Sequence, residues 1–175
     1  MNINRQGLRV AALWAALLLF SGVVLAATPG MVEPGAVLRE ARMQGLNGPD
    51  RALSQYRGKP LLINVWASWC GPCRQEMGSL ERLAWRDQGK RFTVIGISTD
   101  DSEAAAKRYL QQSNATLNHY LDHALELENM LGAERLPLTL LVDARGKVLG
   151  KFYGARDWDN ADAARWIDSR LIAKE

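Results

Sequence analysis

The two cysteines of this 175-residue chain are Cys70 and Cys73, separated by Gly71 and Pro72. An apolar run precedes them and a segment with helical periodicity follows, which predicts that Cys70 stands at the N-terminal edge of a helix. Unpaired backbone N–H groups and the helix dipole stabilise negative charge there, which favours a nucleophilic thiolate at Cys70. Cys73, almost one turn later, could attack the mixed disulfide that Cys70 forms. The spacing therefore predicts a redox-active dithiol.

The neighbouring residues fit this chemistry. Gly71 allows the turn, and Pro72 suits a first helical turn, where a missing N–H costs nothing. Trp69 is expected to form part of a docking surface. A purely structural disulfide is a weak alternative, because a bridge between residues three apart closes almost no loop.

Metal binding is a second hypothesis for these side chains. A zinc site would need two more ligands than the cysteine pair supplies. His119 and His123 lie four residues apart, but no third ligand is evident and we expect both on the surface. We predict no resident metal and no cofactor. A non-catalytic chaperone that holds Cu(I) on the two thiolates is the alternative from another function class.

The elements that must position the dithiol follow from the hydrophobic pattern. Residues 61–66 form a continuous apolar run with one Asn, typical of a central strand covered on both faces. Further strands are predicted at 92–98, 117–121, 137–142 and 147–153, and helices at 73–88 with a Gly89 cap, 103–112, 124–131 and 160–172. This order predicts an α/β fold with parallel strands first and an antiparallel hairpin last, a thioredoxin-like topology.

The N-terminal part has a different composition. Arg5 and Arg9 precede an apolar run, and the next charge is Glu33, so residues 1–27 are predicted to be an export signal or membrane anchor. Residues 28–35 are predicted to be a linker and residues 36–175 the thioredoxin-like domain. Within it, a strand at 37–44, a turn at 47–50 and a helical turn at 52–56 predict a hairpin-like lead-in.

With a formal net charge of +3, the chain lacks the strong positive charge that is typical of nucleic-acid-binding proteins. Two of the positive charges belong to the N-terminal segment, and the remaining chain mixes both signs. We therefore expect no nucleic-acid binding. We also expect a monomer.

The segment Val65-Trp66-Ala67-Ser68-Trp69-Cys70-Gly71-Pro72-Cys73-Arg74-Gln75-Glu76-Met77 resembles the active site of the exported thioredoxin-like disulfide reductases of the TlpA family, related to ResA and CcmG. The similarity extends from about residue 33 to the end. It implies a thioredoxin-like fold whose central mixed sheet is flanked by helices. It also implies an N-terminal hairpin-like extension and an inserted helix and strand between the second core strand and a cis-proline.

The resemblance also implies roles for particular residues. Thioredoxins have a buried Asp where this chain has Asn64, which cannot titrate. Glu76 matches a glutamate of the family, and partial burial would let it accept the proton of Cys73. Pro137 matches the cis-proline, and the backbone of Leu136 would pair with the substrate.

Two positions depart from the family. Gly78 stands where a helix-kinking Pro is common, so the helix is expected to run straighter. Leu138 stands where a Thr often follows the cis-proline. Both changes concern substrate fit rather than the chemistry.

Together these features predict a periplasmic thiol–disulfide oxidoreductase that reduces protein disulfides through Cys70, Cys73 and Glu76, with Trp69, Gly71, Pro72, Leu136 and Pro137 as the substrate-binding residues. Expected partners are disulfide-containing periplasmic proteins, with apocytochrome c as one candidate, and a membrane electron donor of the DsbD or CcdA type. The protein would be tethered to the inner membrane or released after signal cleavage. A dithiol oxidase or isomerase is the alternative with the same chemistry. A shift of about 30 mV in reduction potential changes the balance between dithiol and disulfide by only ~1.4 kcal/mol, so the sequence leaves the direction of electron flow open.

Overall fold

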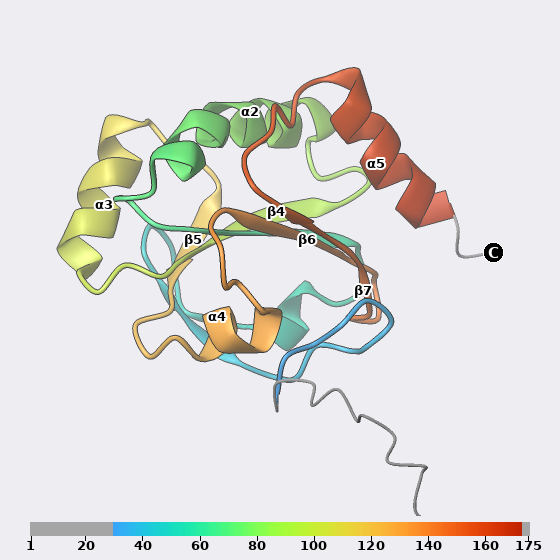
Figure 1. Ribbon diagram of the computed structural model, residues 1–175, viewed down its shortest axis with the longest axis horizontal. Helices are drawn as coiled ribbons and strands as arrows, with labels where there is room; N and C mark the ends of the chain where they lie inside the picture. The colour runs from blue at the N-terminus through green and yellow to red at the C-terminus, as the bar shows by residue number, and fades with distance from the viewer. Residues whose placement is uncertain (1–29, 173–175) are drawn as a thin grey trace, which may run out of the picture.

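The computed structural model describes residues 30–172 (Figure 1). The predicted export segment and the first two linker residues lie outside the described residues. Within residues 30–172, no helix is both long and apolar enough to cross a membrane.

A seven-stranded mixed sheet forms the centre of the domain, in the order β2-β1-β5-β4-β3-β6-β7. The strands are β1 (Arg42–Gly45), β2 (Arg51–Ala52), β3 (Leu61–Trp66), β4 (Thr93–Ser98), β5 (Asn118–Leu121), β6 (Leu138–Val142) and β7 (Val148–Tyr153). Strand β3 pairs parallel with β4 and antiparallel with β6. All six of its residues are buried, as its apolar run predicts.

Helices cover both faces of this sheet. They are α2 (Gly71–Asp87), α3 (Glu103–Gln112), α4 (Glu126–Leu131) and α5 (Ala161–Ile172), with a 3₁₀ turn η1 (Leu53–Tyr56) in the lead-in. Helices α2 and α5 lie on one face of the sheet and α4 on the other (Figure 1). The order of elements and the antiparallel β6–β7 hairpin confirm the predicted thioredoxin-like fold.

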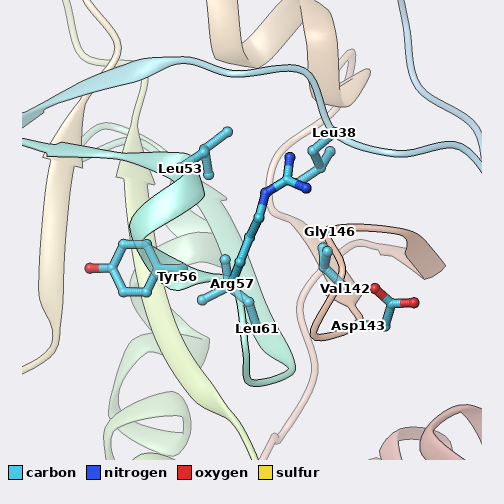
Figure 2. Close-up of a pocket in the computed structure, with 8 residues that line it drawn as sticks. All are labelled: Leu38, Leu53, Tyr56, Arg57, Leu61, Val142, Asp143 and Gly146. Carbon is cyan, nitrogen blue, oxygen red and sulfur yellow. The ribbon is translucent and has the colours of Figure 1, made fainter.

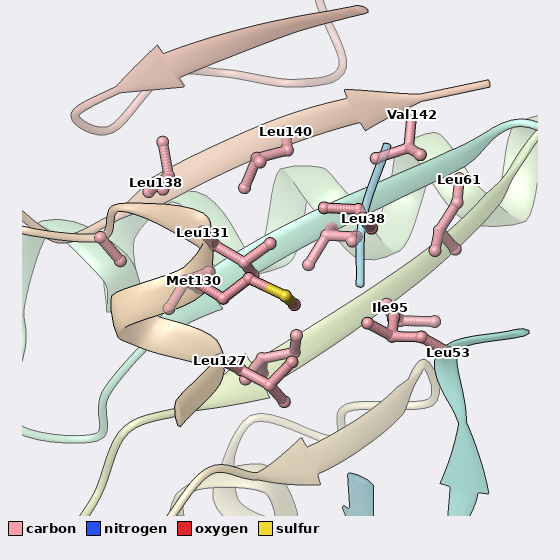
Figure 3. Packing of buried hydrophobic residues seen from close by; sticks show 14 of the residues in the cluster. Leu38, Leu53, Leu61, Ile95, Leu127, Met130, Leu131, Leu138, Leu140 and Val142 are labelled. Carbon is pink, nitrogen blue, oxygen red and sulfur yellow. The ribbon is translucent and has the colours of Figure 1, made fainter. Parts of the chain in front are cut away.

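The alternation of side chains along β3 assigns them to two separate cores. Ile63 and Val65 belong to the cluster that α4 covers, in which Leu127, Met130 and Leu131 pack onto the sheet (Figure 3). The opposite face of the strand meets α2 and α5. Leu62 packs there with Leu80, Leu83 and Trp158, and Trp66 packs with the two cysteines. The strand that ends next to the dithiol is thus held from both sides.

The lead-in forms the predicted hairpin, since β1 pairs antiparallel with β2. Its predicted strand at 37–44 was misplaced, because β1 covers only Arg42–Gly45. Val37 is 51% exposed and makes an isolated bridge to Lys147 instead. The strand begins where Met43 can be buried and where Gln44 and Gly45 can pair with β5, a partner far along the chain.

The insertion expected between the second core strand and the cis-proline is also present. The segment between β4 and Pro137 contains α3, β5 and α4, which is one helix more than the expected helix and strand, and β5 pairs parallel with β4. Helix α2 is continuous over 17 residues, with Gly78 inside it. The predicted Gly89 cap is displaced by one position. Gln88 takes the left-handed C-cap conformation, and Gly89 follows it with a positive φ.

Candidate active site

Cys70 is the N-cap residue of α2, and Pro72 lies in the first turn. The two cysteines form a disulfide. The Cys70 Sγ accepts a hydrogen bond of 3.2 Å from the backbone N–H of Cys73. Cys70 is 6% exposed and Cys73 1% exposed, so Cys70 is the sulfur that an incoming partner can approach. An accessible sulfur at a helix N-terminus is the arrangement that favours a thiolate nucleophile.

An open groove of about 600 Å³ borders this sulfur. Trp69 forms one wall and is 70% exposed, although it is a large aromatic side chain. Leu136 lines the same groove, and the peptide bond from Leu136 to Pro137 is cis, as predicted. The remaining lining residues are Cys70, Gly71, Pro72, Thr99, Asp101, Leu125, Glu128, Ala133 and Glu134. Four of the residues predicted to bind substrate thus line the groove, namely Trp69, Gly71, Pro72 and Leu136, whereas Pro137 is buried.

The loop that leads into Cys70 is bound to the end of β4. Asp100, which is 2% exposed, accepts hydrogen bonds from the Ser68 hydroxyl (2.6 Å), the Ser68 N–H (2.9 Å) and the Ser98 hydroxyl (2.7 Å). These bonds keep the carboxylate of Asp100 satisfied inside the protein. They also hold Ser68, two residues before Cys70.

Glu76 lies on α2, three residues after Cys73, and is only 2% exposed. Positions three apart on a helix share a face, so the carboxylate and the second cysteine lie on the same side of α2. Its Oε1 accepts a hydrogen bond of 2.8 Å from Asn64. Its Oε2 accepts from the Trp158 indole N–H (3.0 Å) and from the Arg156 backbone N–H (3.1 Å). The side chain is thus fixed by β3 on one side and by the loop after β7 on the other.

Burial dominates the electrostatics of Glu76. Removal from water raises the pKa of Glu76, and the three hydrogen bonds and the nearby Arg156 charge offset only part of this effect, so that the pKa rises from 4.5 to about 7. A carboxyl with a pKa near neutrality exchanges protons readily at physiological pH. Glu76 also lines a groove of about 290 Å³ with Ser79, Arg156 and Asp157. This groove is separate from the one at Cys70.

Several residues of this network were not anticipated from the sequence. Trp158 and Arg156 reach Glu76 across more than 75 residues of chain, and Asp100 reaches Ser68 across 32. The only signal for Trp158 was its place in a segment that resembled the family, and it carried no role. Asp100 lies two residues after the end of a buried strand, and polar residues at the carboxyl end of a parallel strand are common in functional sites.

The histidine pair does not form a metal site among the described residues, where no group of three His, Cys, Asp or Glu side chains could hold an ion. The expectation that both histidines are surface residues was wrong for His119, which is 1% exposed. It lies on β5 and packs edge-on against Trp66, with ring centroids 5.4 Å apart. Gly96 on the neighbouring strand leaves room for the imidazole, since a Cβ there would lie 2.1 Å from Nδ1.

A small pocket lies beside Leu61 at the start of β3 (Figure 2), while the dithiol follows the other end of this strand. It is lined by Leu38, Leu53, Tyr56, Arg57, Leu61, Val142, Asp143 and Gly146. Its volume of about 20 Å³ has room for a single water molecule. This cavity is therefore no ligand site.

Residues 34–167 match the family model described as Redoxin. The chain belongs to the Redoxin family. It is 37% identical over 126 residues to the thiol:disulfide interchange protein DsbE of Pseudomonas fluorescens biotype C, with 67% of each chain covered. It is 28% identical over 109 residues to the thiol-disulfide oxidoreductase ResA of Bacillus thuringiensis subsp. konkukian, covering 62% of this chain and 63% of ResA. The Redoxin member thus spans less than two thirds of that relative's length.

Solved structures agree with this assignment. A thiol:disulfide interchange protein DsbE from Chlorobium tepidum superposes with a TM-score of 0.71 at 25% identity, covering 81% of this chain and 97% of the other. A DsbF homologue from Corynebacterium diphtheriae gives 0.67 at 26% identity, covering 82% and 96%. The Redoxin member is therefore a TlpA-like protein of the thioredoxin superfamily, as the resemblance of its dithiol segment indicated.

Proposed function

We propose that this protein is an extracytoplasmic thiol–disulfide oxidoreductase that reduces disulfides of other proteins. The observation that carries the proposal is the Cys70–Cys73 disulfide at the N-terminus of α2, with Cys70 bordering a groove that an exposed Trp69 flanks. The names of the ResA and DsbE relatives support the reaction class. The basic and apolar N-terminal sequence supports export to the periplasm, with or without retention as a membrane anchor.

The reaction starts from the reduced dithiol. The Cys70 thiolate attacks one sulfur of the substrate disulfide, a bond between Cys70 Sγ and that sulfur forms, and the other substrate sulfur leaves as a thiolate. Cys73 then gives its proton to Glu76 and attacks Cys70 Sγ. The mixed disulfide breaks, the second substrate thiolate leaves, and the Cys70–Cys73 disulfide remains. Two electrons pass to the substrate, and the proton released by Glu76 together with one proton from water converts its two thiolates to thiols.

Substrate would occupy the groove of Trp69 and Leu136. Trp69 offers a rigid apolar surface to a partner chain. Leu136, which precedes the cis-proline, would pair its backbone with the extended segment that carries the disulfide. Candidate substrates are oxidised extracytoplasmic proteins, including apocytochrome c. The spent disulfide would be reduced again by a membrane electron donor of the DsbD or CcdA type.

The decisive test is reduction of insulin disulfides by residues 30–175, expressed without the N-terminal segment. Dithiothreitol serves as the electron source. We expect catalysis that Cys70→Ser abolishes. A Cys73→Ala variant should instead accumulate a mixed disulfide through Cys70, and mass spectrometry of the trapped proteins identifies the substrates. Stoichiometric Cu(I) binding without any insulin reduction would overturn the proposal in favour of the metallochaperone.

A further inference from the structure

The amide of Asn64 has an incomplete set of partners. Its Nδ2 donates both hydrogens, one to Glu76 Oε1 at 2.8 Å and one to Thr139 Oγ1 at 3.0 Å. Its Oδ1 is buried and has no hydrogen-bond partner. Asn64 is 2% exposed, and leaving a carbonyl unpaired in the interior costs free energy that native structures seldom accept without a reason.

The orientation of the amide fits the ionised form of Glu76. A carboxylate can only accept hydrogen bonds, so it requires the NH₂ side of the amide to face it. A protonated carboxyl carries one O–H, which must donate. Oε2 already accepts from two N–H groups, those of Trp158 and Arg156, and neither can accept in return. A proton on Glu76 therefore resides on Oε1, which faces Asn64.

We infer that Asn64 is a positioning residue whose amide reverses with the proton of Glu76. In the ionised state Nδ2 donates to Oε1. When Oε1 is protonated, a half-turn about the last side-chain bond brings Oδ1 to the same place, where it accepts from Oε1–H. Thr139 allows this exchange, because a hydroxyl can accept from Nδ2 in one state and donate to Oδ1 in the other.

This inference rests on the proposed role of Glu76 as the proton acceptor for Cys73, and it explains why a non-titrating residue can serve here. Asn64 offers a partner to both forms of Glu76 and adds no second charge to the site. An aspartate would place another carboxylate against Oε1, and two such groups cannot both ionise at this distance. The amide thus keeps Glu76 in place while its proton comes and goes.

The charged and titratable groups around Glu76 are few. β3 and β6 present neutral Asn64 and Thr139. The groups that can carry charge are Cys73 and Arg82 on α2, and Arg156 and Asp157 on the loop after β7. In the oxidised protein Cys73 does not titrate, so the oxidised form isolates the equilibrium of Glu76.

The test is a pH titration of the oxidised protein by NMR, which follows the Glu76 carboxyl carbon and the Asn64 side-chain NH₂ together. We expect both signals to change with the same midpoint, near pH 7. The NH₂ protons should move upfield on protonation, because they lose their acceptors. Glu76→Gln should abolish the Asn64 transition. Asn129, whose Nδ2 donates to the Leu125 carbonyl, serves as the control and should not change.

Two aromatic variants sharpen the test. Trp158→Phe removes one donor to Oε2 and should raise the midpoint of Glu76 by about one pH unit, with the Asn64 midpoint moving equally. Trp166→Phe is the matched control. The Trp166 ring packs against Trp158, with ring centroids 5.8 Å apart, but makes no hydrogen bond to Glu76, so both midpoints should stay in place.

An Asn64 signal that stays constant through the Glu76 transition would overturn the inference, as would an Asn64 midpoint that stays in place when Trp158→Phe shifts the midpoint of Glu76. An inactive protein in the insulin assay that still shows the coupled titration would overturn the proposed function and leave this inference standing.

Discussion

Ser68 and Asp100 join the loop before Cys70 to the end of β4, through a 2.6 Å bond between the Ser68 hydroxyl and Asp100 Oδ1 and a 2.9 Å bond from the Ser68 N–H to Oδ2. The position of Cys70 therefore depends on a strand that follows it in the chain, in addition to the helix that it caps. Asp100 fixes the dithiol without touching it.

Asp100→Asn is expected to destabilise the protein by about 1–3 kcal/mol, because an amide NH₂ would face one of the buried donors and leave it unpaired. Chemical denaturation measures this change. Asp101→Asn is the matched control: Asp101 is exposed, and its stability effect should stay within about 0.5 kcal/mol. Equal losses in the two variants would contradict the role of Asp100.

Glu76→Gln is expected to slow the resolving attack of Cys73 by about 100-fold, the lower end of the range for a lost acid–base group. The pH profile of that step should also lose its inflection near pH 7, since burial raises the pKa of Glu76 to about 7. Single-turnover release of thiol from the Cys70 mixed disulfide measures the rate. Glu81→Gln, on the same helix, should keep the inflection. An unchanged profile in Glu76→Gln would remove Glu76 from the mechanism.

The same carboxyl predicts a dependence of stability on pH. The folded pKa of about 7 exceeds the ordinary value of 4.5, so the folded state retains a proton that the unfolded state releases between these pH values. Stability linked to Glu76 is therefore complete below pH ~4.5 and is lost as pH rises to about 7. We expect the wild-type protein to lose about 3 kcal/mol relative to Glu76→Gln across this range. Denaturation of both oxidised proteins at several pH values tests this, and a constant difference would refute it.

Trp69→Ala is expected to raise the KM for a protein substrate about tenfold, because truncating an aromatic anchor commonly costs more than about 1 kcal/mol of binding. Stability should change little, since the side chain is 70% exposed. Trp85→Ala is the matched control: Trp85 is 67% exposed on α2 but does not line the groove at Cys70. Steady-state kinetics with a disulfide-bonded protein distinguish the two variants, and an equal effect of both would argue against a docking role for Trp69.

Two glycine substitutions should act in opposite directions. In Gly96→Ala the new Cβ would lie 2.1 Å from His119 Nδ1 and 2.9 Å from Trp66 Nε1, both on buried rings, so a loss of about 3 kcal/mol is expected. In Gly78→Ala the nearest neighbour is the flexible end of Arg82 at 3.5 Å, and the helix should gain about 0.5–1 kcal/mol. Thermal unfolding measures both. A tolerated Gly96→Ala would show that the His119 pocket can rearrange.

Much of the architecture could be predicted, because it depends on short-range patterns. A buried central strand needs a continuous apolar run, and 61–66 supplies one that coincides with β3. The dithiol needs its cysteines almost one turn apart at the start of a helix, and neighbouring residues alone determine that spacing. The positions of Cys73 and Glu76 on one face of α2 follow from helical geometry in the same way.

The contacts that give these residues their properties could not be predicted. Glu76 meets Asn64 across 12 residues and Trp158 across 82, and its burial depends on how α2 packs between β3 and the loop after β7. His119 is buried because β5 pairs with β4 beside Gly96, and the start of β1 depends on its pairing with β5. The sequence alone thus determined which residues can exchange disulfides and on which element each lies. Only the tertiary structure decided which side chains surround Glu76, because strand order and packing join residues whose separation in the chain carries no periodic signal.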